Sequence, residues 1–69
     1  MNNYFTIQIK KNNIINYIRG FDTQMIPMLT QNYDNAETFD FLEACEKRNM
    51  LNEKRRYKYN NFYIEKVGL

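Results

Sequence analysis

The chain has 69 residues, a net charge of +2 and a single cysteine, and 16% of its residues are aromatic. This length suits one domain, residues 1–69, close to the lower limit at which a single core outweighs chain entropy. The lone Cys45 excludes an internal disulfide framework and indicates a reducing, cytoplasmic setting. No segment approaches the roughly 18 apolar residues of a membrane span, so we expect no membrane partner.

The first part of the chain predicts a β-hairpin. Residues 4–10 alternate between polar and apolar side chains, as a strand with one buried face does. Asn12 and Asn13 are suited to a two-residue turn because asparagine tolerates positive φ. Residues 14–19 alternate again as the returning strand, and Gly20 is expected to end it.

The middle of the chain carries weaker signals. Pro27 cannot donate to a sheet ladder, which favours an edge position, and residues 28–31 predict a short third strand there. Asp34 and Glu37 have the spacing of a capping pair. We therefore expect a single helical turn over residues 35–39.

Residues 40–51, DFLEACEKRNML, predict the main helix. Asp40 is suited to accept hydrogen bonds from the first free backbone N–H groups, and Glu43 completes a capping box. At 3.6 residues per turn, one face of this helix carries an apolar stripe. Its members are Phe41, Ala44, Cys45, Arg48 and Leu51, with Leu42 at the edge.

The chain then continues through a polar connector to a final alternating strand over residues 61–67, antiparallel to one strand of the hairpin. The predicted fold is α+β, a small antiparallel sheet of three to four strands packed on one helix, in the order β-β-(β)-α-β. The expected core consists of Phe5, Ile7, Ile9, Ile18, Phe39, Phe41, Leu42, Cys45, Leu51, Phe62 and Ile64.

The residue types argue against catalysis. The chain has no histidine, which removes the commonest general base and metal ligand, and its two glycines form no phosphate-binding loop. Cys45 is interpreted as a packed core thiol, and Glu43 and Glu46 as capping and solvated residues. We therefore expect no enzyme activity, no metal site and no cofactor.

Charge is distributed in blocks of +3 over residues 1–19, −6 over 20–46 and +5 over 47–58. The last block contains a basic and aromatic segment, Lys54, Arg55, Arg56, Tyr57, Lys58 and Tyr59. Three interpretations remain open: a solvated connector, a protein-binding surface rich in Arg and Tyr, and a nucleic-acid surface with cations for phosphates and rings for bases. The acidic residues Asp34, Glu37 and Asp40 form an alternative partner surface.

The layout of the chain resembles that of small proteins of phages and mobile elements of low-GC bacteria. The segments that carry this resemblance are, in order, YFTIQIKK, INYIRGFD, an Ala36-x-x-Phe39 step, a helix containing Glu-Ala, and NNFYIEKV. Anti-CRISPR and other anti-defence proteins belong to this group. The resemblance implies a non-enzymatic inhibitor that binds a host protein or ribonucleoprotein effector in the cytoplasm of a bacterial host cell. The alternative is a small nucleic-acid-binding module that uses residues 54–59. A homodimer through an exposed sheet edge is a third alternative.

Overall fold

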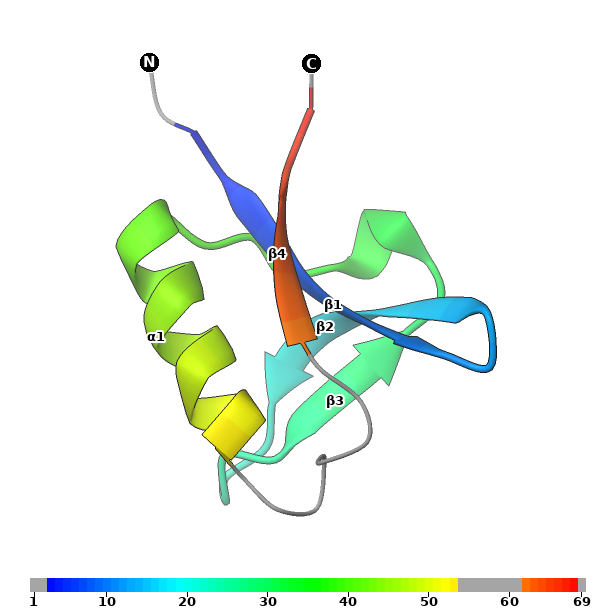
Figure 1. Ribbon diagram of the computed structural model, residues 1–69, viewed down its shortest axis with the longest axis horizontal. Helices are drawn as coiled ribbons and strands as arrows, with labels where there is room; N and C mark the ends of the chain where they lie inside the picture. Colours follow the sequence, from blue (N-terminus) through cyan, green and yellow to red (C-terminus); the bar gives the residue numbers. More distant parts are fainter. Residues whose placement is uncertain (1–2, 54–61, 69) are drawn as a thin grey trace.

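The computed structural model describes residues 3–53 and 62–68 (Figure 1). The fold is α+β, with one antiparallel sheet whose strand order is β3-β2-β1-β4 and a helix between β3 and β4. The elements in chain order are β1 (Phe5–Lys11), β2 (Ile14–Phe21), β3 (Pro27–Thr30), a 3₁₀ turn η1 (Tyr33–Asn35), α1 (Phe41–Glu53) and β4 (Phe62–Lys66). The predicted fold class is confirmed, and β4 pairs with β1 of the hairpin.

The hairpin forms as the Asn-Asn pair predicts. Asn12 and Asn13 have φ angles of 53° and 65°, and Lys11 pairs with Ile14 across the turn. The expectation that Gly20 ends the second strand is wrong, because β2 continues to Phe21 after a register shift against β3. A Cβ at Gly20 would lie 3.2 Å from the terminal methyl group of Met28, an exposed and flexible side chain that can move aside, so packing alone does not require glycine at this position.

Residues 37–39 lie beside the first part of β1, which β2 does not pair with. The N–H of Glu37 donates to the carbonyl of Ile18 at 2.9 Å, at the site of the register shift. Phe39 and Phe5 exchange both backbone hydrogen bonds at 2.8 Å. A short extended segment thereby joins the start of β1, and it places the Phe39 ring in the core.

The helical turn expected over residues 35–39 is wrong for the same reason, since this pairing requires extended backbone. The turn lies earlier, as η1, and Asn32 rather than Asp34 caps it. The Asn32 side chain accepts from the N–H of Asp34 at 3.0 Å. The third strand is also one residue earlier than expected and begins at Pro27, an edge position that needs no donor.

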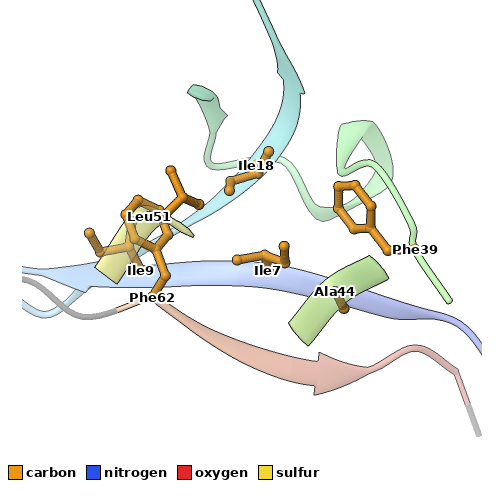
Figure 2. Close-up of a cluster of buried hydrophobic side chains, with 7 residues drawn as sticks. All are labelled: Ile7, Ile9, Ile18, Phe39, Ala44, Leu51 and Phe62. Carbon is orange, nitrogen blue, oxygen red and sulfur yellow. The ribbon is translucent and has the colours of Figure 1, made fainter. Parts of the chain in front are cut away.

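The core lies between α1 and one face of the sheet (Figure 2). Leu51 of α1 gathers with the cross-strand pair Ile9 and Phe62, and Ala44 lies toward the Phe39 end of the cluster. The buried apolar residues are Ile7, Ile9, Ile18, Phe39, Ala44, Leu51 and Phe62. Phe5, Phe21, Met50 and Ile64 are partly buried against them.

Three helix residues expected in the core are not fully buried there. Leu42 is 69% exposed and Phe41 60% exposed, while Cys45 is half-buried. Ala44 is fully buried and faces the sheet. Leu42 precedes it by two residues, and at about 100° per residue its side chain points to nearly the opposite side of the helix. Phe41 belongs to the first turn of α1, where its ring meets Phe5 edge-on with centroids 5.3 Å apart.

The beginning of α1 confirms Asp40 as the predicted N-terminal cap. The carboxylate of Asp40 accepts from the N–H of Glu43 at 2.8 Å, and the carbonyl of Asp40 accepts the first helical bond, from Ala44, at 2.9 Å. The ammonium group of Lys47 lies 5.3 Å from the centre of the Phe21 ring, which adds a cation–π contact between α1 and β2.

Asn52 connects the last turn of α1 to the beginning of β4. Its side-chain oxygen accepts from the N–H of Phe62 at 2.8 Å, and its amide nitrogen donates to the carbonyl of Phe62 at 3.1 Å. The amide thus gives Phe62 the two hydrogen bonds that a neighbouring strand residue would give. Asn52 therefore aligns β4 with the helix.

Replacing Asn52 by alanine is expected to lower the free energy of unfolding by about 1–3 kcal/mol, because two backbone groups of Phe62 lose these bonds. Urea unfolding followed by circular dichroism measures this loss. Asn49→Ala is the matched control, since it makes the same change in helix propensity at an exposed position of α1. Equal effects of the two substitutions would show that the Asn52 bonds contribute nothing.

Candidate binding surface on the second face of the sheet

The sheet has a second face, opposite α1, and it is partly buried as well. Ile7 and Ile9 of β1 point into the core, so Thr6 and Gln8, which alternate with them, point to the opposite side. Both of these polar side chains are only 1% exposed. Neighbouring side chains on this second face therefore cover them, which is unusual for the outer side of a small sheet.

The register identifies the aromatic neighbours. Gln8 pairs with Tyr17 of β2 on one side and with Tyr63 of β4 on the other. Tyr17 also pairs with Thr30 of β3, so these four residues form one row across the whole sheet. The Tyr33 ring, from η1, meets the Tyr17 ring edge-on at 5.2 Å and 82°. We call this surface, formed by Gln8, Tyr17, Tyr33, Tyr63 and Glu65, the tyrosine face.

A polar pair lies in the middle of the tyrosine face. The side-chain amide nitrogen of Gln8 donates to the carboxylate of Glu65 on β4, which lies two residue pairs farther along the ladder, opposite Thr6. The Thr6 hydroxyl donates a long hydrogen bond of 3.5 Å to the Glu65 carbonyl. The oxygen of the Gln8 side chain is buried and has no hydrogen-bond partner among the described residues. A buried acceptor without a donor is costly, so this atom marks the position as unusual.

The acidic residues singled out in the sequence are exposed but serve local structure. Asp40 caps α1, and the backbone N–H of Asp34 donates to the Asn32 side chain within η1. The backbone N–H of Glu37 donates to Ile18, while its carboxylate lies near Gly20. All three remain available to solvent along one connecting segment, residues 34–40.

The basic and aromatic segment Lys54, Arg55, Arg56, Tyr57, Lys58 and Tyr59 lies outside the described residues. Its two flanks are placed: α1 ends at Glu53, and β4 begins at Phe62. The prediction that this segment binds a partner stays a prediction.

Sequence reasoning did not single out Gln8, Tyr17, Tyr63 and Glu65 as a group. Strand alternation alone assigns Gln8 to the polar side of its strand, and Tyr63 and Glu65 to a common side of theirs. What alternation lacks is the register, because Gln8 and Glu65 are 57 residues apart and meet only through the β1–β4 pairing. The sequence feature that could have indicated this site is Gln8, an amide side chain in the middle of a strand whose neighbouring residues are apolar or buried.

Within residues 3–53 and 62–68 there is no enclosed pocket and no group of acidic or cysteine side chains placed to hold a metal ion. No helix in those same ranges is long and apolar enough to cross a membrane. No family model, no curated protein and no solved structure matches this chain.

Proposed function

We propose that the protein is a non-enzymatic, phage-type inhibitor that binds a protein component of a host nucleoprotein effector through the tyrosine face. The observation that supports this proposal most directly is the clustering of Tyr17, Tyr33 and Tyr63 on one side of a four-stranded sheet. Tyrosine is enriched at the energetically dominant positions of protein interfaces, because its ring buries a large area and its hydroxyl keeps a polar handle.

The charges of this face also favour a protein partner. Glu65 contributes a carboxylate from the edge strand β4, and Lys10 lies two residues from Gln8 on the same side of β1. Charged groups beside aromatic residues suit a protein interface, which has a polar rim and in which complementary charges determine specificity. The class of partner, a bacterial defence effector, comes from the resemblance of the sequence layout to anti-defence proteins.

The second candidate is a small nucleic-acid-binding module. The presence of Lys10 beside the tyrosines favours it, since cations neutralise phosphates while tyrosine rings stack on bases. The basic segment 54–59 would extend such a surface. Glu65 argues against it, because its carboxylate, which accepts from Gln8 on this face, repels a phosphate backbone.

Capture of partners from the lysate of a low-GC bacterium, with and without nuclease, tests the two candidates. The inhibitor proposal expects one dominant protein that survives nuclease treatment and that Tyr63→Ala weakens at least tenfold, as loss of an interface anchor does. Leu42→Ala, on the solvent side of α1, is expected to leave capture unchanged. Partners that vanish with nuclease would favour the nucleic-acid module instead.

A third variant separates the tyrosine face from the basic segment. If substitution of Lys54, Arg55 and Arg56 by serine abolishes capture while Tyr63→Ala does not, the interface is the basic segment. The proposal for the tyrosine face is then wrong, although the protein still binds a partner.

A further inference from the structure

The row of residues across the sheet places one polar side chain between two aromatic rings. Tyr17 and Tyr63 are each the direct cross-strand neighbour of Gln8, on opposite sides of β1. Because adjacent strands lie about 4.8 Å apart, the two tyrosine positions are separated by roughly 10 Å. Tyr63 is 40% exposed and Tyr17 half-buried, so the β4 end of the row is the more exposed one.

The hydrogen-bonding capacity that remains between the rings is that of an acceptor. The amide nitrogen of Gln8 already donates to the Glu65 carboxylate, whereas the Gln8 oxygen is buried with no partner among the described residues. A carboxylate has two oxygens and more acceptor capacity than one donor fills. Gln8, between the two tyrosines, and the Glu65 carboxylate that it contacts together offer acceptors and a negative charge beside two aromatic rings.

We propose that Gln8 and Glu65, flanked by Tyr17 and Tyr63, form a subsite for an arginine side chain of the protein partner. The guanidinium group is planar, carries five donors and stacks on aromatic rings, so it matches each feature of this subsite. It pairs with carboxylates in a forked geometry that the compact ammonium of lysine cannot adopt. This proposal rests on the proposed function, which supplies a protein as the partner.

The subsite is closed in the free protein. Gln8 is 1% exposed, so a guanidinium reaches its oxygen only after a covering side chain moves. Tyr63 is the candidate for this movement, because it lies on the edge strand and is the more exposed of the two tyrosines. A donor from the ligand then satisfies an acceptor that the closed state leaves unpaired, which favours the open, bound state. Lys10 opposes a cationic ligand, but it is exposed, so solvent and salt screen its charge.

Binding of short blocked peptides to the intact protein tests this subsite. The probes are Gly-Arg-Gly, Gly-Lys-Gly and Gly-citrulline-Gly, and the readout is the side-chain amide resonance of Gln8 together with the ring resonances of Tyr63. The arginine peptide is expected to shift both sets of resonances with millimolar affinity and to bind about tenfold more tightly than either other peptide. The citrulline peptide tests the charge, because it keeps the planar shape.

Variants identify the residues responsible. Glu65→Gln is expected to weaken the arginine peptide about tenfold, whereas Glu46→Gln removes the same charge from the exposed side of α1 and is expected to change nothing. Tyr63→Phe keeps the ring and is expected to retain binding. Dispersed backbone resonances show that each variant is folded.

Guanosine monophosphate serves as a fourth probe, for a nucleotide ligand. Three results would overturn the subsite: no shift of the Gln8 amide at the highest soluble peptide concentration, equal binding of the lysine peptide, or stronger shifts with guanosine monophosphate than with the arginine peptide. Failure of the subsite is distinguishable from failure of the proposed function. Nuclease-resistant capture that depends on Tyr63 but does not compete with the arginine peptide leaves the function in place and removes the subsite. Arginine-selective shifts without any captured protein would support the subsite and contradict the proposed function.

Discussion

Replacing Leu51 by alanine is expected to lower the free energy of unfolding by about 2–5 kcal/mol, as large-to-small changes in a core do. Leu51 is fully buried and lies beside Ile9 and Phe62 in the core cluster (Figure 2). A 69-residue domain has a total stability of roughly 3–10 kcal/mol, so this one change is expected to remove a large fraction of it. Urea unfolding followed by far-ultraviolet circular dichroism measures the loss.

Leu42→Ala in the same helix is the matched control. Leu42 is 69% exposed, so its replacement is expected to change stability by no more than about 0.5 kcal/mol. Both substitutions change helix propensity by the same small amount, and the difference between them therefore measures burial alone. A loss at Leu42 as large as that at Leu51 would mean that the solvent side of α1 is covered, against the arrangement described above.

This pair of leucines shows where sequence reasoning succeeded and where it stopped. The helix itself, its cap at Asp40 and the burial of Leu51 follow from capping chemistry and from a spacing of 3.6 residues per turn. Which part of the stripe meets the sheet depends on how α1 lies across β1 and β4. That angle is a property of tertiary packing, so Ala44 is fully buried while Phe41 is exposed.

The buried side of each strand could be predicted from the sequence more reliably than the buried face of the helix. A side-chain period of two assigns each residue to a side of its strand, and the Asn12-Asn13 turn fixes the register of the hairpin locally. The register between β1 and β4 has no local signal, because a helix and a connector separate them in the chain. The meeting of Gln8 with Glu65 depends on that register, and the candidate subsite could not be found from the sequence alone.

The segment before α1 was misjudged for a related reason. Asp34 and Glu37 have the spacing of a helix cap, but Phe39 gains more from pairing with Phe5 and burying its ring than residues 35–39 gain from one isolated helical turn. A single turn is unfavourable by itself, since nucleation fixes several residues for one hydrogen bond. Long-range pairing therefore overrides the local pattern.

The second large effect is expected at Phe39. Its replacement by alanine removes a ring that is 3% exposed and should lower the free energy of unfolding by about 3–5 kcal/mol. The same change weakens the attachment of residues 37–39 beside β1, where Phe39 and Phe5 exchange backbone hydrogen bonds of 2.8 Å. Faster hydrogen exchange of the Phe5 amide is therefore expected, in addition to the global loss measured by urea unfolding.

Phe41→Ala separates burial from mere contact with Phe5. The Phe41 ring also meets Phe5, at 5.3 Å, but it is 60% exposed, so its removal is expected to cost no more than about 1.5 kcal/mol. Equal losses at Phe39 and Phe41 would contradict the described core. Faster exchange at Phe5 without a global loss in Phe39→Ala would instead show that residues 37–39 open as a local unit. Residues 37–39 would then not belong to the part of the domain that unfolds cooperatively.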